Sequence, residues 1–315
     1  MQREVQLRIP WSPIQLPHRK PKLWRLIRRL VGLQEDPDAE ILSGMIISLR
    51  HASEAALGQG LRNTVAITAP WMRLWQDDCP GDSTVNEALR IAGLKPAPLG
   101  IMHPIYISET NAVLAANGRR ICQDRWCYGA EASHEDPYTD DVVYLISFTY
   151  HSIYTSFQFA SCFFHDSCDN KMGLIDPKLG FDRRDNAKNG AAFWHSLRQY
   201  LVKRVIEYSK HGRDIPPTSY MVVLAGEAAE SAEFFNVVGE AIGDIKKLAT
   251  KSKPTPKIEL VLSNHPVYAA ARGAAFWMRT SLDPAYCDDY IEEVEREEGP
   301  RSEKHEASDH GHGEL

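Results

Sequence analysis

Apolar residues recur at helical spacing in two long stretches of the chain. Residues 38–57 and 191–209 carry apolar side chains three or four positions apart, which predicts two amphipathic helices. The apolar face is Ile41, Met45, Leu49, Ala52 and Ala56 in the first helix, and Phe193, Leu197, Leu201, Val205 and Tyr208 in the second. Such a face is the side that a surface helix normally turns toward the core.

Short runs of β-branched and aromatic residues lie between these helices and several shorter ones. Residues 142–164 form the strongest β region, long enough for two strands in a hairpin. Further strands are expected at 64–68, 99–107, 220–225 and 258–262, and further helices at 83–93, 109–117, 231–242 and 267–279. This alternation predicts an α/β fold in which helices cover a sheet.

The two ends of the chain differ from its middle. Residues 1–21 read as an irregular, proline-rich arm, and residues 22–33 as a basic amphipathic helix. That helix either packs on its own domain, as most do, or binds a membrane surface or partner. The apolar stripe of this helix is Leu23, Leu26, Ile27, Leu30 and Val31.

The tail from residue 283 is acidic and is expected to be disordered.

Composition narrows the class of protein. The 315 residues are 43% hydrophobic, which is enough for a core, and the net charge of −6 gives no electrostatic footprint for nucleic acid. No apolar stretch approaches the ~20 residues of a membrane span, and no secretory signal is visible. Six irregularly spaced cysteines indicate reduced thiols. We therefore expect a cytoplasmic protein, with the nucleus as the alternative compartment.

Several segments, in order, resemble the ATPase domain of the seventy-kilodalton heat-shock chaperones. These are Ala39–Pro70, Ser83–Leu94 (STVNEALRIAGL), Glu109–Gly118 (ETNAVLAANG), Met221–Phe235 (MVVLAGEAAESAEFF) and Asn264–Phe276 (NHPVYAAARGAAF). The chain also resembles divergent chaperone-like proteins common in fungi, which lack a peptide-binding domain. The resemblance covers residues 39–279.

The resemblance implies a two-lobed, actin-like (ribonuclease-H-like) α/β fold. Under it, residues 1–37 are an arm and an amphipathic helix, and residues 283–315 a disordered acidic tail. Residues 38–141 would be a partial first lobe, truncated at its N-terminus, and residues 142–282 a reduced second lobe.

The sequence departs from that family where phosphate would bind. There is no glycine before Gly32, so the glycine-rich first phosphate loop and its strand have no counterpart, and neither does the family's catalytic lysine. The second phosphate loop falls on Tyr144–His151, which contains neither Gly nor Asp. A Mg²⁺ ion favours carboxylates beside phosphate oxygens, and this stretch offers none. We expect no catalytic residue, no metal and no bound cofactor.

The family's adenosine segment is partly retained. Its Gly-Gly-Ser becomes Gly226, Glu227 and Ala228 here, and Ser147 and Thr149 come from the altered second loop. The resemblance makes these five residues the candidate nucleotide contacts. The leading interpretation is a pseudo-ATPase that serves as a protein-binding module for an unidentified partner. The alternative is weak ATP or ADP binding with residual or no hydrolysis.

A third interpretation belongs to another class of protein. Cys162, His165 and Cys168 offer three ligands for Zn²⁺, or the parts of a thiol-dependent site. Structural zinc sites normally use closely spaced pairs of cysteines with a partner pair, which is not the pattern here. Buried thiols in a β-hairpin remain the simpler explanation.

Overall fold

The computed structural model describes most of the central part of the chain. The described residues are 37–70, 84–96, 106–117, 141–159, 173–186, 190–211, 219–249 and 256–282, with isolated positions from 285 to 296. The expected helix 22–33, the Cys162–Cys168 segment and nearly all of the acidic tail lie outside these residues.

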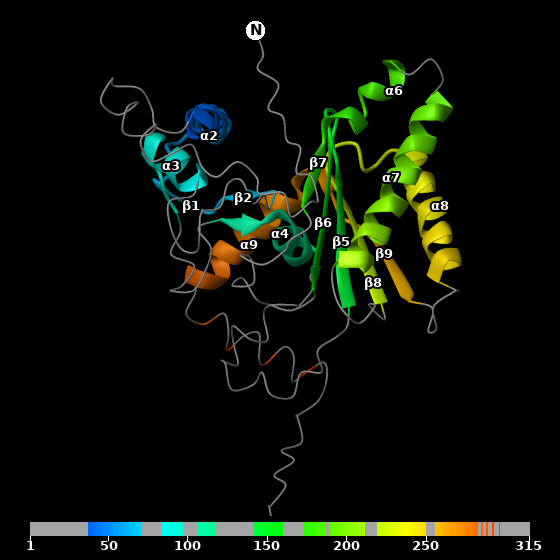
Figure 1. Cartoon of the computed structure of the whole chain (residues 1–315). Helices are drawn as coiled ribbons and strands as arrows, with labels where there is room; N and C mark the ends of the chain where they lie inside the picture. Colours follow the sequence, from blue (N-terminus) through cyan, green and yellow to red (C-terminus); the bar gives the residue numbers. More distant parts are fainter. Residues whose placement is uncertain are drawn as a thin grey trace, which may run out of the picture.

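A five-stranded mixed sheet forms the centre of the molecule, in the order β7-β6-β5-β8-β9 (Figure 1). The hairpin β5–β6 is antiparallel, β7 pairs antiparallel with β6, and β8 and β9 run parallel to β5. The expected α/β fold, with a hairpin at residues 142–164, is confirmed in this coarse form. The strands are β5 (Asp141–Phe148), β6 (Ile153–Phe159), β7 (Leu174–Asp176), β8 (Ser219–Ala225) and β9 (Lys257–Leu262).

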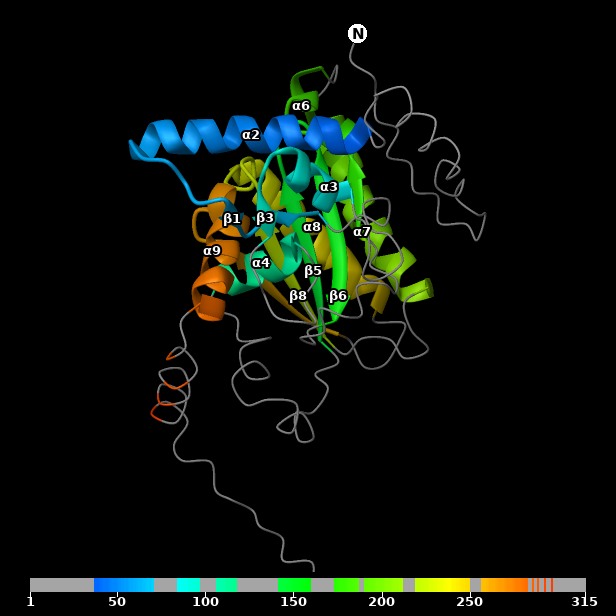
Figure 2. The same cartoon turned by 90° about the vertical axis from the view of Figure 1, so that its left-hand side faces the viewer.

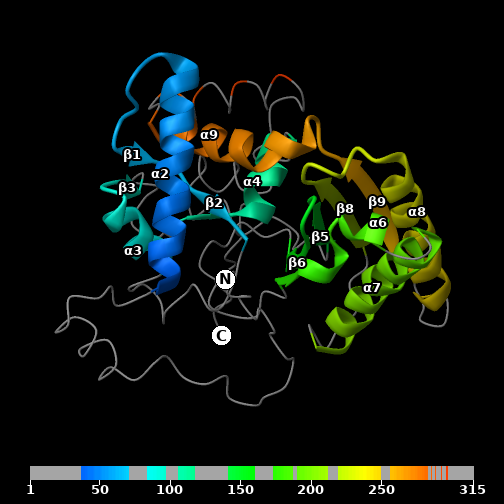
Figure 3. The same ribbon diagram turned by 90° about the horizontal axis from the view of Figure 1, so that it is seen from above.

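Both faces of this sheet are covered by helices, as Figures 1 and 3 show. One face packs against α7 (Gly190–His211) and α8 (Ala232–Ala249) through alternate residues of β5 such as Tyr144 and Ile146. The other packs against α4 (Glu109–Ala116) and α9 (Ala269–Leu282) through Val143 and Leu145. Because β5 and β8 are buried on both sides, they are nearly continuous apolar runs.

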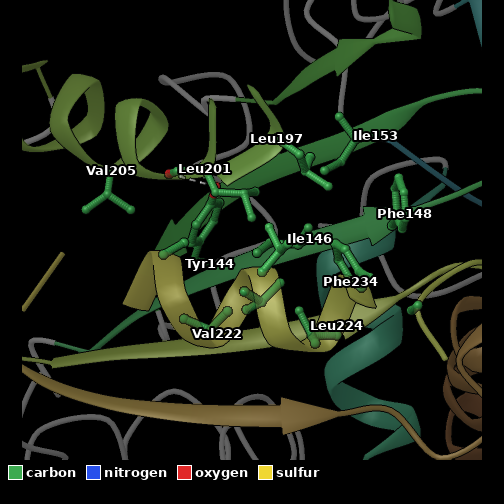
Figure 4. Close-up of a cluster of buried hydrophobic side chains, with 14 of the residues drawn as sticks. Tyr144, Ile146, Phe148, Ile153, Leu197, Leu201, Val205, Val222, Leu224 and Phe234 are labelled. Atoms are coloured by element: carbon green, nitrogen blue, oxygen red, sulfur yellow. Dashed lines mark hydrogen bonds between the residues drawn. The ribbon is translucent and has the colours of Figure 1, made fainter. Parts of the chain in front are cut away.

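Helix α7 buries the apolar face that its spacing predicts. Leu197 is fully buried and Leu201 nearly so, and Figure 4 shows Leu201 beside Tyr144 and Leu197 toward Ile153. The Tyr144 hydroxyl donates to the Leu201 carbonyl at 3.3 Å, so the ring fills the core while its polar end stays paired.

Helix α2 (Pro37–Leu57) does not bury its predicted apolar face. It runs across the short strands and α3 (Thr84–Ile91), as Figure 2 shows, and its buried residues are Ala39 and Ser43. Ile41, Met45 and Leu49 are exposed. The helix is confirmed, but the apolar spacing alone indicates the wrong side as the buried one.

The strand expected at 64–68 is wrong as a single element. It is split into β1 (Thr64–Val65), paired with β3 (Lys95–Pro96), and β2 (Thr68–Ala69), paired with β4 (Ile107–Ser108). The two halves of the expected strand therefore pair with different partner strands.

One smaller difference concerns the edge of the central sheet. Between the hairpin and α7, where no element is expected, the chain forms strand β7, η4 (Pro177–Leu179) and α6 (Arg183–Asn186). Gly93 ends α3 as predicted, in a left-handed conformation that lets Leu94 N–H donate to the Leu89 carbonyl.

None of the helices in the described part of the chain is long and apolar enough to cross a membrane.

Candidate functional site

The candidate residues gather at the edge where the parallel strands β5 and β8 end. Ser147 pairs in register with Ala225, so the hairpin tip at residues 149–152 lies beside the turn that follows β8. In open α/β sheets, ligands bind beyond the carboxyl ends of parallel strands. The structure therefore brings Thr149 close to Gly226, Glu227 and Ala228.

Thr149 is used to close the hairpin tip. Its N–H donates to the Ser152 carbonyl at 2.9 Å, and its hydroxyl donates to the same carbonyl at 3.0 Å. The Ser152 N–H in turn donates to the Thr149 hydroxyl at 3.1 Å. The N–H and hydroxyl groups of Thr149, a candidate nucleotide contact, are thus both hydrogen-bonded within the same turn.

Glu227 reaches back from the turn after β8 to the same tip. Its Oε1 accepts a hydrogen bond from the Tyr150 N–H at 2.7 Å. A charged acceptor makes this a strong bond between segments far apart in the sequence. The amides of residues 149, 150 and 152 therefore all donate to groups of the protein itself.

Gly226 is required by the close approach of two backbones. Its φ is +95°, and a Cβ there would lie 2.3 Å from the Phe148 carbonyl oxygen. Its N–H donates to the Pro266 carbonyl at 3.0 Å, and the Ala228 N–H donates to that of Phe148 at 3.0 Å. The glycine that resembles an adenosine contact thus brings the turn directly against the hairpin.

Gly180 holds the tip from the other side. A Cβ at this position would lie 2.3 Å from the backbone carbon of His151. The Phe181 N–H donates to the Thr149 carbonyl at 3.1 Å, and the Asp182 N–H donates to the Tyr150 carbonyl at 2.9 Å. Backbone contacts on both sides therefore clamp the tip in one conformation.

Ser147 serves the opposite side of the sheet. It is buried, and it lies on the side of the sheet that packs against α4, near Glu109 at the start of that helix. Burial raises the pKa of the Glu109 carboxyl, and the Ser147 side chain opposes that rise. Sequence reasoning includes Glu109 in the chaperone-like segment 109–118 but assigns it no role. The signal that was available is a carboxylate directly after the helix cap Ser108.

Polar side chains continue along the contact between α4 and the hairpin. The Thr110 hydroxyl lies 2.6 Å from that of Ser156, and Gln158 donates to the Asn111 side chain. These four side chains are buried. Paired buried polar groups fix the register of two elements without costing an unsatisfied donor or acceptor.

No protein-family model matches the chain, and no curated protein matches it. Among solved structures, it is similar to a chain of a PilM-PilN type IV pilus biogenesis complex, at 13% identity and a TM-score of 0.35 over 64% of this chain and 57% of that one. It is also similar to a ROK family protein from Streptococcus pneumoniae TIGR4 in complex with sucrose, at 12% identity and a TM-score of 0.36 over 75% of this chain and 86% of that one.

These likenesses carry no argument about function. This chain spans little more than half the length of the pilus protein that it matches. Nothing in the comparisons supports the heat-shock or fungal part of the expected resemblance, so that part stays a prediction.

The described residues hold no group of three or more His, Cys, Asp or Glu side chains arranged to bind a metal ion. Cys162, His165 and Cys168 lie outside them, so the zinc and thiol hypotheses stay predictions. What the described edge does offer is a hairpin tip at which the N–H groups of residues 149, 150 and 152 donate to other groups of the protein.

Proposed function

We propose that this chain is a non-catalytic relative of the actin-like ATPases, a pseudo-ATPase that serves as a protein-binding module. The observation that carries the proposal is the hydrogen bond from Tyr150 N–H to the Glu227 carboxylate. A phosphate group at this tip would have to displace a carboxylate that already holds the amide. It would also meet the negative charge of that carboxylate at close range.

The fold assignment behind this proposal draws on the central sheet. An antiparallel hairpin continues into β7, and two parallel strands on the other side of β5 are each followed by a helix. This order is compatible with a ribonuclease-H-like lobe. The resemblance then puts a phosphate loop at the β5–β6 tip and an adenosine loop after β8. The division into lobes at residues 38–141 and 142–282 is part of the proposal.

The protein-binding part is supported by apolar side chains at the same edge of the sheet. Tyr150, Phe235, Leu262, Val267 and Tyr268 are exposed, and each lies at or just beyond the carboxyl end of a parallel strand or in the first turn of α8. We infer that these side chains form one apolar patch, since a contiguous patch of this kind marks an interaction surface. A nucleotide's phosphates would gain nothing from such side chains.

The decisive experiment is a titration of the purified chain with ATP and ADP, with and without Mg²⁺, followed by calorimetry and thermal unfolding. A ligand of the native state at a hundredfold excess over its Kd stabilises that state by about 2.7 kcal/mol. We expect no heat of binding and no shift at millimolar nucleotide. A Mg²⁺-dependent shift of a few degrees would overturn the pseudo-ATPase proposal.

A matched pair of variants tests the role of Glu227 itself. Glu227→Ala removes the acceptor of the Tyr150 N–H, whereas Glu230→Ala removes the same charge from an exposed position of the same turn. We expect Glu227→Ala to lower the free energy of unfolding by roughly 0.5–1.5 kcal/mol relative to Glu230→Ala. Equal stabilities of the two variants would mean that the bond from Tyr150 N–H to Glu227 does not stabilise the tip. That result would contradict the proposal that Glu227 excludes phosphate.

The second candidate function is weak ATP or ADP binding without turnover. It is favoured by the left-handed Gly226 at the end of a parallel strand, a position where backbones often approach ligands. A substitution of Gly226 is a poor test, because any Cβ there collides with Phe148 and disturbs the fold. Direct titration separates the two candidates. Zinc content of the purified protein, before and after Cys162→Ser, tests the third hypothesis.

The partner surface is tested by co-purification from the native source with quantitative mass spectrometry. Val267→Asp with Tyr268→Asp should remove specific partners, since both side chains are at least half exposed. Leu248→Asp, exposed near the opposite end of α8, is the matched control and should retain them. Identical partner lists for both variants would contradict a binding surface at this edge.

A further inference from the structure

The apolar stripe on α2 has no cover among the described residues. Ile41, Met45 and Leu49 are 57%, 63% and 69% exposed, and Ala52 and Ala56 on the same side of the helix are exposed too. The opposite side is the packed one, as buried Ala39 and Ser43 show. Three large apolar side chains one turn apart form an interaction surface the width of one helix.

The segment directly before α2 has the matching pattern. Residues 22–33 place Leu23, Leu26, Ile27, Leu30 and Val31 on one side of an expected helix of three turns. Only Gln34, Glu35 and Asp36 separate this segment from Pro37, the first residue of α2. Proline is favoured at that position because it needs no hydrogen-bond acceptor there. Antiparallel helix pairs are typically joined by loops of about this length.

We propose that residues 22–33 of the same chain fold back as an antiparallel helix and cover the exposed stripe of α2. Pairing about the Glu35–Asp36 peptide places Leu30 opposite Ile41 and Leu26 opposite Met45. It also places Leu23 close to Leu49. The apolar residues of the two stripes therefore oppose one another over three successive turns.

Charges along the pair agree with the same arrangement. The basic residues Arg25, Arg28 and Arg29 lie off the apolar stripe of residues 22–33. The first turn of α2 carries Asp38 and Glu40, which the antiparallel register brings within about one turn of Arg28 and Arg29. The inference does not rest on the proposed pseudo-ATPase function, because it concerns only α2 and the segment before it.

Photo-crosslinking of the full chain tests the proposal. A benzophenone side chain is introduced at Met45, or at His51 as the control, an exposed position about 120° around α2. The Met45 probe should crosslink to residues 22–33 of its own chain, independently of protein concentration, and the His51 probe should not. Crosslinks to a second chain, to anionic vesicles added in parallel, or to no part of residues 22–33 would overturn the proposal.

Limited proteolysis supplies a second measurement. Docking protects the bonds after Arg25, Arg28 and Arg29 from trypsin, and Met45→Asp should accelerate cleavage there by about tenfold or more. His51→Asp should leave the cleavage rate unchanged. Because neither position contacts the sheet core, thermal unfolding of the core should stay the same in both variants. Rapid cleavage of the unmodified chain at the rate of the Met45→Asp variant would show that the segment is not docked.

Discussion

Helices α7 and α2 carry the same kind of apolar spacing and put it to opposite uses. In α7 the spaced residues Leu197 and Leu201 are buried against the sheet. In α2 the spaced residues Met45 and Leu49 are about two-thirds exposed, while Ala39 and Ser43 on the other side are buried. The spacing predicts a helix in both cases, but a second surface decides which side becomes the interior.

The difference follows from what each helix has beside it. Helix α7 crosses a sheet that offers large side chains, among them Tyr144 and Phe157, so long apolar residues gain the most contact there. Helix α2 meets short strands and α3, and its inner side uses small residues together with Arg50, which bonds to Glu54 and the Leu61 carbonyl. The apolar stripe is left for another segment.

The largest expected effect comes from the same substitution in the two helices. Leu197→Ala opens a cavity in the core and should lower the free energy of unfolding by about 2–5 kcal/mol. Leu49→Ala removes contact only with the docked segment 22–33 proposed above, outside the sheet core, and should change global unfolding by no more than about 0.5 kcal/mol. Urea denaturation of both variants measures the difference. Similar losses would show that the stripe on α2 belongs to the core after all.

Two glycines sharpen the comparison between covered and uncovered helix surfaces. A Cβ at Gly273 of α9 would lie 1.6 Å from the Ala112 carbonyl oxygen of α4, whereas Gly239 of α8 has open space around it. Gly273→Ala should therefore cost about 1–3 kcal/mol by forcing the helices apart. Gly239→Ala should stabilise by up to about 1 kcal/mol, since alanine favours the helix. Thermal unfolding with opposite shifts is the expected outcome, and equal shifts would contradict the close α4–α9 contact.

What the sequence predicts well is local, and what it misses is set by distant contacts. The hairpin β5–β6 and helices α4 and α7 follow from β-rich runs and helical spacing within one segment. The split strand at Thr64–Ala69 does not, because its two partner strands lie elsewhere in the chain. The bond from Tyr150 to Glu227 joins residues 77 positions apart. The spacing of apolar residues within one segment gives no indication of such a bond.

The candidate site shows the same limit. The resemblance makes Gly226, Glu227 and Thr149 candidate nucleotide contacts, and the structure brings these residues together at one edge of the sheet without testing that role. Sequence reasoning does not foresee that Thr149 bonds within its own turn, or that Ser147 faces α4 and Glu109. The side of a strand on which a residue points depends on register, which the pairing of whole strands determines.

The smallest expected effect concerns carboxylates in the first turns of two helices. Burial raises the pKa of Glu109, so the folded state binds its proton more tightly than the unfolded chain. Stability is therefore lost as the pH rises from about 4.5 through the raised pKa, and Glu109→Gln should remove that loss. The gain from the variant is absent in acid and grows toward neutral pH, because glutamine carries no charge for burial to destabilise.

Glu233 in α8 is the matched control with the opposite sign. Its own backbone N–H and then Ser231 lower the pKa of its carboxyl, so it stabilises the fold above its unfolded-state pKa and loses that effect as the pH falls. Glu233→Gln should thus weaken the protein at neutral pH and have no effect in acid. Urea denaturation at a series of pH values measures the stability of each variant relative to the unmodified chain. The two differences should be near zero in acid and should grow with opposite signs toward neutral pH. Equal effects of the two variants would mean that the Glu109 carboxylate has a favourable ionic partner in the folded state, so that its burial does not raise its pKa.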